Sequence, residues 1–246
     1  MSEDEKSVTE GVSRKAADAL ADAKRQAALA EARKLEAEAE AAELGTQRAR
    51  IETEKALEAE AKRKAGNEFL HIYDFATPVA DASVATAIQT LNQWSRLCPD
   101  CDITIQFCSP GGEAIAGMRL FDFILDLRAR GHKVTTEAWG YAASMAGILL
   151  QAGTVRRCGA ESWILIHQIT AAVRGKIGEI DDEVEFIHKM GDRVLDIFAT
   201  RAREAAENGT AKKALSRAQF AKRWERKDWW LSSKEALEFG VVDEVF

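Results

Sequence analysis

The large apolar residues of this chain are confined to one part of its sequence. All 18 aromatic residues and all three prolines of the 246 residues lie after residue 66. Aromatic side chains supply much of the area that a protein core buries, so residues 1–66 lack the material for a packed core. We therefore expect two domains: a helical or coiled-coil arm over residues 1–66 and a folded domain over residues 67–246.

Residues 1–66 have the composition of a helix without a core. They contain 18 Ala, 15 Asp or Glu and 13 Lys or Arg, which favours helix locally but offers little apolar surface to bury. A long solvated helix is one interpretation. The other is a coiled coil, because Leu44, Ile51 and Leu57 follow one another at intervals of seven and six residues. Helix breaks are expected at Gly45 and Gly66.

Composition and charge exclude several partners and locations. The formal net charge is −6, so the chain lacks the basic footprint of a nucleic-acid-binding protein. Its acidic N-terminus has no apolar segment of a secretory signal. The longest apolar stretch, residues 141–150, has 10 residues, whereas a membrane-spanning helix needs about 20. We expect a cytoplasmic protein that binds neither nucleic acid nor membrane.

The four cysteines are expected to be reduced thiols, because the chain shows no secretory signal. Cys98 and Cys101 have the spacing of half a zinc site, but no second such pair follows. A pair of free thiols in a loop is therefore the preferred interpretation.

Residues 67–246 alternate strand-like and helical patterns, as is typical of a layered α/β domain. A turn is expected at Gly140. Strands are expected at residues 69–73, 103–107, 134–139 and 163–168, and helices at residues 82–96, 114–130, 144–151 and 177–203.

Two segments carry residues suited to stabilising a reacting oxyanion. Ser144 stands among small residues where a strand is expected to turn into an apolar helix, and the N-terminus of a helix favours negative charge. A helix N-cap serine is the alternative. Gly111 and Gly112 follow a predicted buried strand, where glycines let backbone N–H groups approach a ligand. A tight strand-to-helix turn would also use them.

Two further residues fit proton transfer. His167 ends a predicted apolar strand, where a neutral imidazole can act as general base to a serine. A buried structural histidine is the alternative. Asp228 stands next to Trp229 and Trp230, where a buried carboxylate can orient an imidazole, and a solvated or capping Asp is the alternative.

In their order and context these segments resemble the Clp protease proteolytic subunit family, ClpP, which is peptidase family S14. The matching motifs are SPGG at 109–112, GxAASM at 140–145, IHQ at 166–168, and a DxxLS…EA…GVVD pattern from 228 to 243. The similarity covers about residues 69–246.

The resemblance implies an α/β fold of the ClpP/crotonase type, a superhelix of β-β-α units, preceded here by the charged helical arm. The long helix from residue 177 matches the handle through which two rings meet. Neither a metal nor an organic cofactor is needed. The implied roles are Ser144 as nucleophile, His167 as general base, Asp228 as orienting acid, and Gly112 and Met145 as backbone donors of the oxyanion hole.

The implied function is a serine endopeptidase that cleaves proteins or peptides inside a homo-oligomer of stacked rings. Several positions depart from the family pattern. Cys108 and Ile169 stand where the family usually has Asn and Pro, and residues 171–175 replace a Gly-rich strand that pairs with substrate. The polar segment 204–226 makes the position of Asp228 the least secure of the three, with Glu225 as the alternative.

The arm stands in place of the short N-terminal loops of the family. This argues against docking of an AAA+ unfoldase and favours a phage or prophage type of peptidase that processes head or scaffold proteins. Two other functions stay open. One is a non-catalytic, ring-forming scaffold protein with residues 1–66 as its interaction arm, and the other is a crotonase-type acyl-CoA enzyme.

Overall fold

A computed structural model describes residues 3–225 and 227–246, so the first two residues of the expected arm lie outside it. The chain divides into two compact units, Met1–Lys64 and Ala65–Phe246. The helices are α1 (Glu3–Lys64), α2 (Asp81–Leu97), α3 (Ala114–Ala129), α4 (Met145–Leu150), α5 (Ile177–Glu207), α6 (Arg217–Trp224) and α7 (Ser233–Glu238). The strands are β1 (Ile72–Phe75), β2 (Ile103–Ser109), β3 (Val134–Ala143), β4 (Val155–Cys158), β5 (Trp163–Ile166), β6 (Trp229–Ser232) and β7 (Glu244–Val245).

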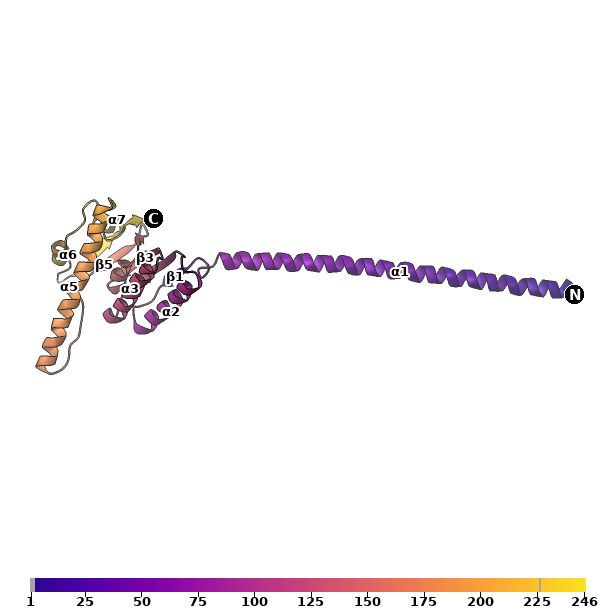
Figure 1. The fold of residues 1–246 in the computed structure, drawn as a ribbon, viewed down its shortest axis with the longest axis horizontal. Coiled ribbons are helices and arrows are strands. Elements are labelled where there is room, and N and C mark those ends of the chain that lie inside the picture. Colours follow the sequence, from indigo (N-terminus) through magenta and orange to yellow (C-terminus); the bar gives the residue numbers. More distant parts are fainter. Residues whose placement is uncertain (1–2, 226) are drawn as a thin grey trace. The chain divides into compact units, whose positions relative to one another are not determined.

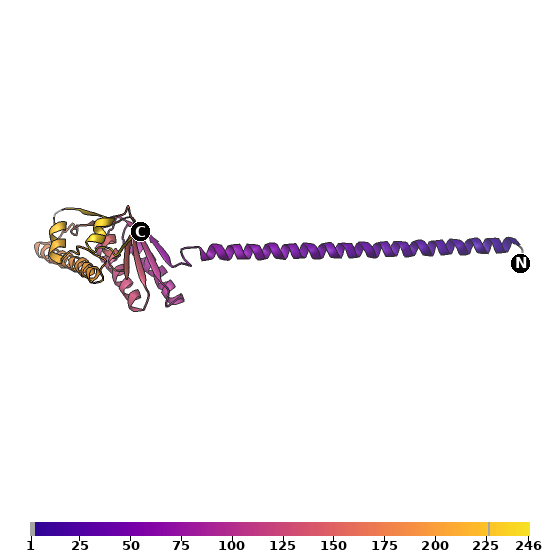
Figure 2. The ribbon, with the colours of Figure 1, turned by 90° about the horizontal axis from the view of Figure 1, so that it is seen from above.

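The first unit is the single helix α1, which confirms the predicted N-terminal helix. Figure 1 shows it without interruption, and Figure 2 shows the same continuity from a second direction. The expected break at Gly45 is wrong, because one glycine costs a helix only about 1 kcal/mol and its Ala-rich neighbours favour helix. From residue 18 onward every side chain of α1 is exposed.

The second unit is built on one seven-stranded sheet, and the predicted α/β class is confirmed. The strands run in the order β1-β2-β3-β4-β7 and are all parallel. The C-terminal end of β3 also pairs with β5, in parallel, and β5 pairs with β6 in the antiparallel direction. Because parallel strands end at the same edge of a sheet, the segments after β2, β3 and β5 come close together.

Alternation of apolar and polar residues decides which face of the sheet is buried. Ile103, Ile105 and Phe107 of β2 are completely buried, whereas Gln106 between them is not. Helices α2, α3 and α4 contact the sheet, and Figure 1 shows α2 and α3 beside each other. All buried residues of α5 lie in its second half, from Val194 to Ala205, and its first turns extend beyond the sheet (Figure 1).

The structure differs from the expected elements at three places. Strand β1 begins at Ile72 and not at residue 69, because residues 66–71 form turns closed by hydrogen bonds such as Leu70 N–H to the Gly66 carbonyl, 3.1 Å. Gly140 is not a turn but lies inside β3 with φ +72°. Strand β5 ends at Ile166, so His167 lies just beyond it. The short elements β4, β6, β7, α6 and α7 were not expected.

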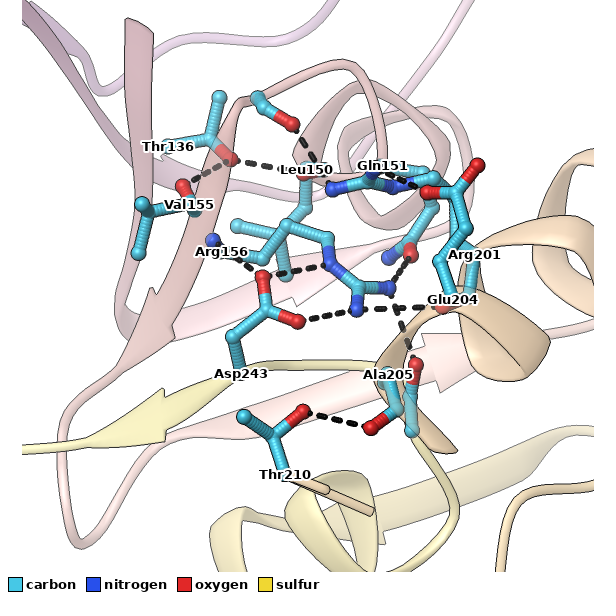
Figure 3. A network of polar contacts seen from close by, with 12 residues as sticks. Thr136, Leu150, Gln151, Val155, Arg156, Arg201, Glu204, Ala205, Thr210 and Asp243 are labelled. Atoms are coloured by element: carbon cyan, nitrogen blue, oxygen red, sulfur yellow. Dashed lines mark hydrogen bonds and ion pairs between the residues drawn. The ribbon is translucent and has the colours of Figure 1, made fainter. Parts of the chain in front are cut away.

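A buried ion pair fastens the C-terminal segment to the sheet. Figure 3 shows Arg156 of β4 enclosed by Asp243 and Gln151. The guanidinium donates to both carboxylate oxygens of Asp243, at 3.0 and 2.5 Å, and its side chain is 1% exposed. Burial alone would raise the pKa of the Asp243 carboxyl, but the hydrogen bonds and charge of Arg156 outweigh it and lower this pKa below its ordinary value. The pair thereby keeps β7 beside β4.

No helix within residues 3–225 and 227–246 is both long enough and apolar enough to cross a membrane.

Candidate active site

The glycine turn after β2 forms one wall of the site. Ser109 at the end of β2 is buried, and its hydroxyl donates to the carbonyl of Thr77 at 2.6 Å. Gly111 and Gly112 then adopt φ +84° and +147°, a region of conformation that other residues rarely enter. A bridge to Val79 fixes the turn, with the Val79 N–H bonded to the Gly111 carbonyl at 2.8 Å.

Ser144 lies on a strained turn between β3 and α4. Its φ of +54° is unusual for a residue with a side chain, and such strained residues concentrate at active sites. The backbone N–H of Ser144 donates to the carbonyl of Leu165 in β5 at 2.9 Å. Helix α4 begins at the next residue, Met145. A strand–turn–helix geometry of this kind exposes the nucleophilic serine in the α/β-hydrolase class of enzymes.

The register of β2 and β3 sets where Ser144 stands. Phe107 pairs with Ala138, and the next pair is Ser109 with Ala142. Strand β3 therefore uses four residues where β2 uses two, and Gly140 lies within this bulge. Bulges bend a strand and redirect the side chains that follow. This bulge carries the end of β3 to the glycine turn.

The glycine turn and the serine turn are in direct contact. A Cβ atom placed on Gly111 would lie 2.5 Å from the Ala143 carbonyl oxygen and 2.7 Å from the Ser144 Cβ. A Cβ on Gly112 would lie 2.2 Å from the Val79 carbonyl oxygen. Only glycine fits at either position, so the sequence GG is a steric requirement of the site.

Two backbone N–H groups beside Ser144 are suited to hold an oxyanion. Met145 is the first residue of α4, where a helix leaves its N–H groups without an acceptor in the helix. The bridge to Val79 uses the carbonyl of Gly111 and the N–H of Glu113, and so does not occupy the N–H of Gly112. They belong to Gly112 and Met145, the two residues that the family resemblance implies as oxyanion donors.

Ser144 and His167 line one cavity of about 240 Å³ together with Gly112 and Met145. Four of the five residues predicted for the site thus border the same space. The cavity is also lined by Glu113, Ala114, Ile148, Ile166, Gln168, Ile169, Thr170, Val194 and Phe198.

Asp228 does not line this cavity, but it directly precedes β6, the strand that pairs with β5. In the antiparallel pair β5–β6, Trp163 faces Ser232 and Ile166 faces Trp229. The pairing ends at Ile166 and Trp229, so His167 and Asp228 are each the next residue beyond this last pair. No hydrogen bond joins Ser144, His167 and Asp228 within the described chain; such bonds tighten when substrate binds. Glu225, the alternative to Asp228, caps the C-terminus of α6 and lies three residues before Asp228.

Sequence reasoning missed the part of the cavity lining that α5 contributes. Val194 and Phe198 come from α5, far along the chain, and only tertiary packing brings them there. Their spacing of four residues did indicate a shared helix face. Glu113 was also missed, although it directly follows the two glycines.

The remaining candidates take no part in this site. All four cysteines are free thiols, and burial, followed by contact with Cys98, raises the pKa of Cys101 to about 11. No group of three or more His, Cys, Asp or Glu side chains with metal-binding geometry occurs in the described part of the chain. Residues 171–175, for which pairing with substrate is predicted, are described by the structure but form no strand.

A serine on a strained strand-to-helix turn, backbone donors from a glycine turn and a histidine in one cavity define a serine-hydrolase type of site on an α/β sheet. The family model described as Clp protease matches residues 72–246. The chain therefore belongs to the Clp protease family, has the ClpP type of α/β fold and is a serine-type peptidase.

Individual relatives agree with this assignment. An ATP-dependent Clp protease proteolytic subunit of Bacteroides thetaiotaomicron is 30% identical over 173 residues, which cover 69% of this chain and 71% of the relative. Subunit 1 of Chlamydia muridarum is 31% identical over 175 residues, 70% of this chain and 83% of the relative. Subunit 3 of Rhodococcus jostii is 31% identical over 169 residues, 68% and 76% of the two chains.

Replacing Gly111 by Ala tests the contact between the two turns. The added Cβ must displace the Ser144 turn, and a displacement approaching 1 Å can lower the rate by about 100-fold. Gly131→Ala is the matched control, because Gly131 has φ +104° but no atom within 4 Å of the added Cβ. We expect kcat/KM for a fluorogenic peptide to fall about 100-fold in Gly111→Ala and less than threefold in the control. Equal losses would show that backbone strain alone, and not contact with Ser144, matters here.

Proposed function

We propose that this protein is an endopeptidase whose Ser144 hydroxyl attacks the carbonyl carbon of a substrate peptide bond. The observation that carries the proposal is the shared cavity, which Ser144, His167, Gly112 and Met145 all line. Those two N–H groups would hold the oxyanion that forms when the carbonyl carbon becomes tetrahedral.

In the proposed mechanism His167 moves the protons. It accepts the proton of the Ser144 hydroxyl as the oxygen attacks, and it gives this proton to the nitrogen of the leaving peptide as the C–N bond breaks. Water then attacks the acyl ester and loses a proton to His167, which returns it to the Ser144 oxygen. The acid product and the free enzyme result.

Asp228 is the proposed partner of His167. The β5–β6 pairing supports it over Glu225, because Asp228 and His167 are the residues next to the last pair, Trp229 and Ile166. A carboxylate in this position would fix the imidazole tautomer and stabilise its charged form during the reaction.

Comparing Asp228→Asn with Glu225→Gln tests both the activity and this assignment. Each change removes one charge and keeps the shape of the side chain. We expect the wild-type chain to cleave a fluorogenic peptide, kcat to fall roughly a thousandfold or more in Asp228→Asn, and Glu225→Gln to stay within threefold. A larger loss in Glu225→Gln would contradict the assignment of Asp228. Turnover of an acyl-CoA thioester without peptide cleavage would contradict the endopeptidase.

We further propose that the chain works as a homo-oligomer with an internal chamber for protein or peptide substrates. The relatives are named as subunits, and the first half of α5 exposes apolar side chains, among them Ile177, Val184 and Phe186. These would suit contact with a second copy. Stacked rings and the processing of head or scaffold proteins stay predictions, and so does the argument that the arm disfavours docking of an AAA+ unfoldase.

The arm has a seam through which copies of α1 could associate. Apolar residues recur along it at intervals of three and four, as at the core positions a and d of a coiled coil. Leu57 is not at one of these positions. With Leu20 at position a, Arg33 of one parallel helix faces Glu38 of the next, an attractive pair. The seam consists of Leu20, Ala23, Ala27, Ala30, Ala37, Ala41, Leu44 and Ile51, with Lys34 and Arg48 at the two other positions.

Limited proteolysis of the full chain tests the arm. Two double variants are compared: Leu44→Glu/Ile51→Glu, which changes the seam, and Leu29→Glu/Leu57→Glu, which lies outside it. All four side chains are exposed on α1. Loss of association would expose the 13 Lys and Arg of residues 1–66 to trypsin. We expect trypsin to cleave the arm about tenfold faster in the seam variant and at most about twofold faster in the control, because the protease cleaves mainly the chains whose arms are dissociated. Equal rates would contradict the seam.

A further inference from the structure

The cavity beside Ser144 contains one carboxylate that the proposed reaction does not use. Glu113 follows Gly112, one of the two proposed oxyanion donors, and lines the same cavity. A solvent-exposed carboxylate therefore borders the cavity that the proposed catalytic residues line, with no Lys or Arg among the described lining residues.

The Glu113 side chain is free to take a partner. It precedes α3 but makes no capping hydrogen bond to that helix. Its backbone N–H donates to the Val79 carbonyl at 2.8 Å, whereas its carboxylate makes no ion pair or hydrogen bond within the described chain. An acidic residue at this point also favours the helix through its dipole, which is the structural alternative to a role in binding.

One wall of the cavity is apolar. Ile148 of α4 and Val194 and Phe198 of α5 form this wall. The volume, about 240 Å³, lies below the roughly 300–1,000 Å³ of pockets for drug-sized ligands, and so suits a single side chain. A side chain with a long hydrocarbon stem and a cationic end would satisfy the apolar wall and the carboxylate together.

We propose that this cavity binds the Lys or Arg side chain of the residue whose carbonyl Ser144 attacks, and that Glu113 pairs with its charged end. The inference rests on the proposed endopeptidase function and names its substrate class. The side chain of the attacked residue branches from the atom next to the carbonyl carbon. When the carbonyl oxygen lies at the Gly112 and Met145 N–H groups, this side chain enters the space that Glu113 borders.

Two peptides that differ at one residue separate the charge from the apolar contact. One carries lysine before the cleaved bond, and the other carries norleucine, which has a similar straight hydrocarbon chain without the ammonium group. The full-length chain should cleave the lysine peptide about tenfold better in kcat/KM. In Glu113→Gln the ratio of kcat/KM for the lysine peptide to that for the norleucine peptide should fall to between one half and two. Only kcat/KM for the lysine peptide should decrease.

Charge reversal and a matched control sharpen the test. Glu113→Lys should favour a peptide with glutamate at the same position over the lysine peptide. Asp81→Asn, which removes an acidic residue from the first turn of α2 outside the cavity, should leave the lysine-to-norleucine ratio unchanged. Thermal unfolding of each variant shows whether the fold is kept.

The outcomes distinguish the two proposals. Hydrolysis of both peptides with the same ratio in the wild type and in Glu113→Gln would overturn the role of Glu113 and leave the endopeptidase intact. Hydrolysis of neither peptide by the wild type would overturn the endopeptidase and this inference together. An unchanged peptide preference in Glu113→Lys would also contradict the role of Glu113.

Discussion

The contact between two turns at the edge of a parallel sheet determines the rest of the site. Gly111 lies so close to the end of β3 that a single added carbon would meet the Ala143 carbonyl oxygen at 2.5 Å. This approach requires neighbouring parallel strands, whose ends share one edge, and the bulge around Gly140 that lengthens β3. The Ser144 turn, its backbone donors and the cavity beside them follow from that contact.

Two different interactions attach the C-terminal part of the chain to the rest of the sheet. The antiparallel pair β5–β6 ends at Ile166 and Trp229, next to His167 and Asp228. The buried pair of Arg156 and Asp243 then fixes the segment after α7 to β4 (Figure 3). Removing one member of such a buried pair leaves an uncompensated charge, which typically costs about 3–5 kcal/mol. The attachment of this segment to β4 thus depends on two residues 87 positions apart in sequence.

Local patterns predicted the elements and the chemistry, whereas pairing decided their arrangement. Ser144, His167 and the two glycines were singled out because each follows a predicted strand. The helix of the arm was expected from its composition, and the helix from residue 177 from its amphipathic pattern. The bulge at Gly140 was read as a turn, since a glycine with positive φ serves equally in both. Strand β6 was missed because Trp229–Ser232 is short and gains its regularity from pairing with β5. The wall formed by Val194 and Phe198 depends on tertiary packing alone.

The most direct test of this account is the intact mass of the protein after reaction with a fluorophosphonate, which modifies activated serines. The account predicts one adduct per chain, mapped to the peptide that contains Ser144, no adduct in Ser144→Ala, and much slower labelling in His167→Ala. An adduct that persists in Ser144→Ala, or an unlabelled wild-type chain, would contradict it.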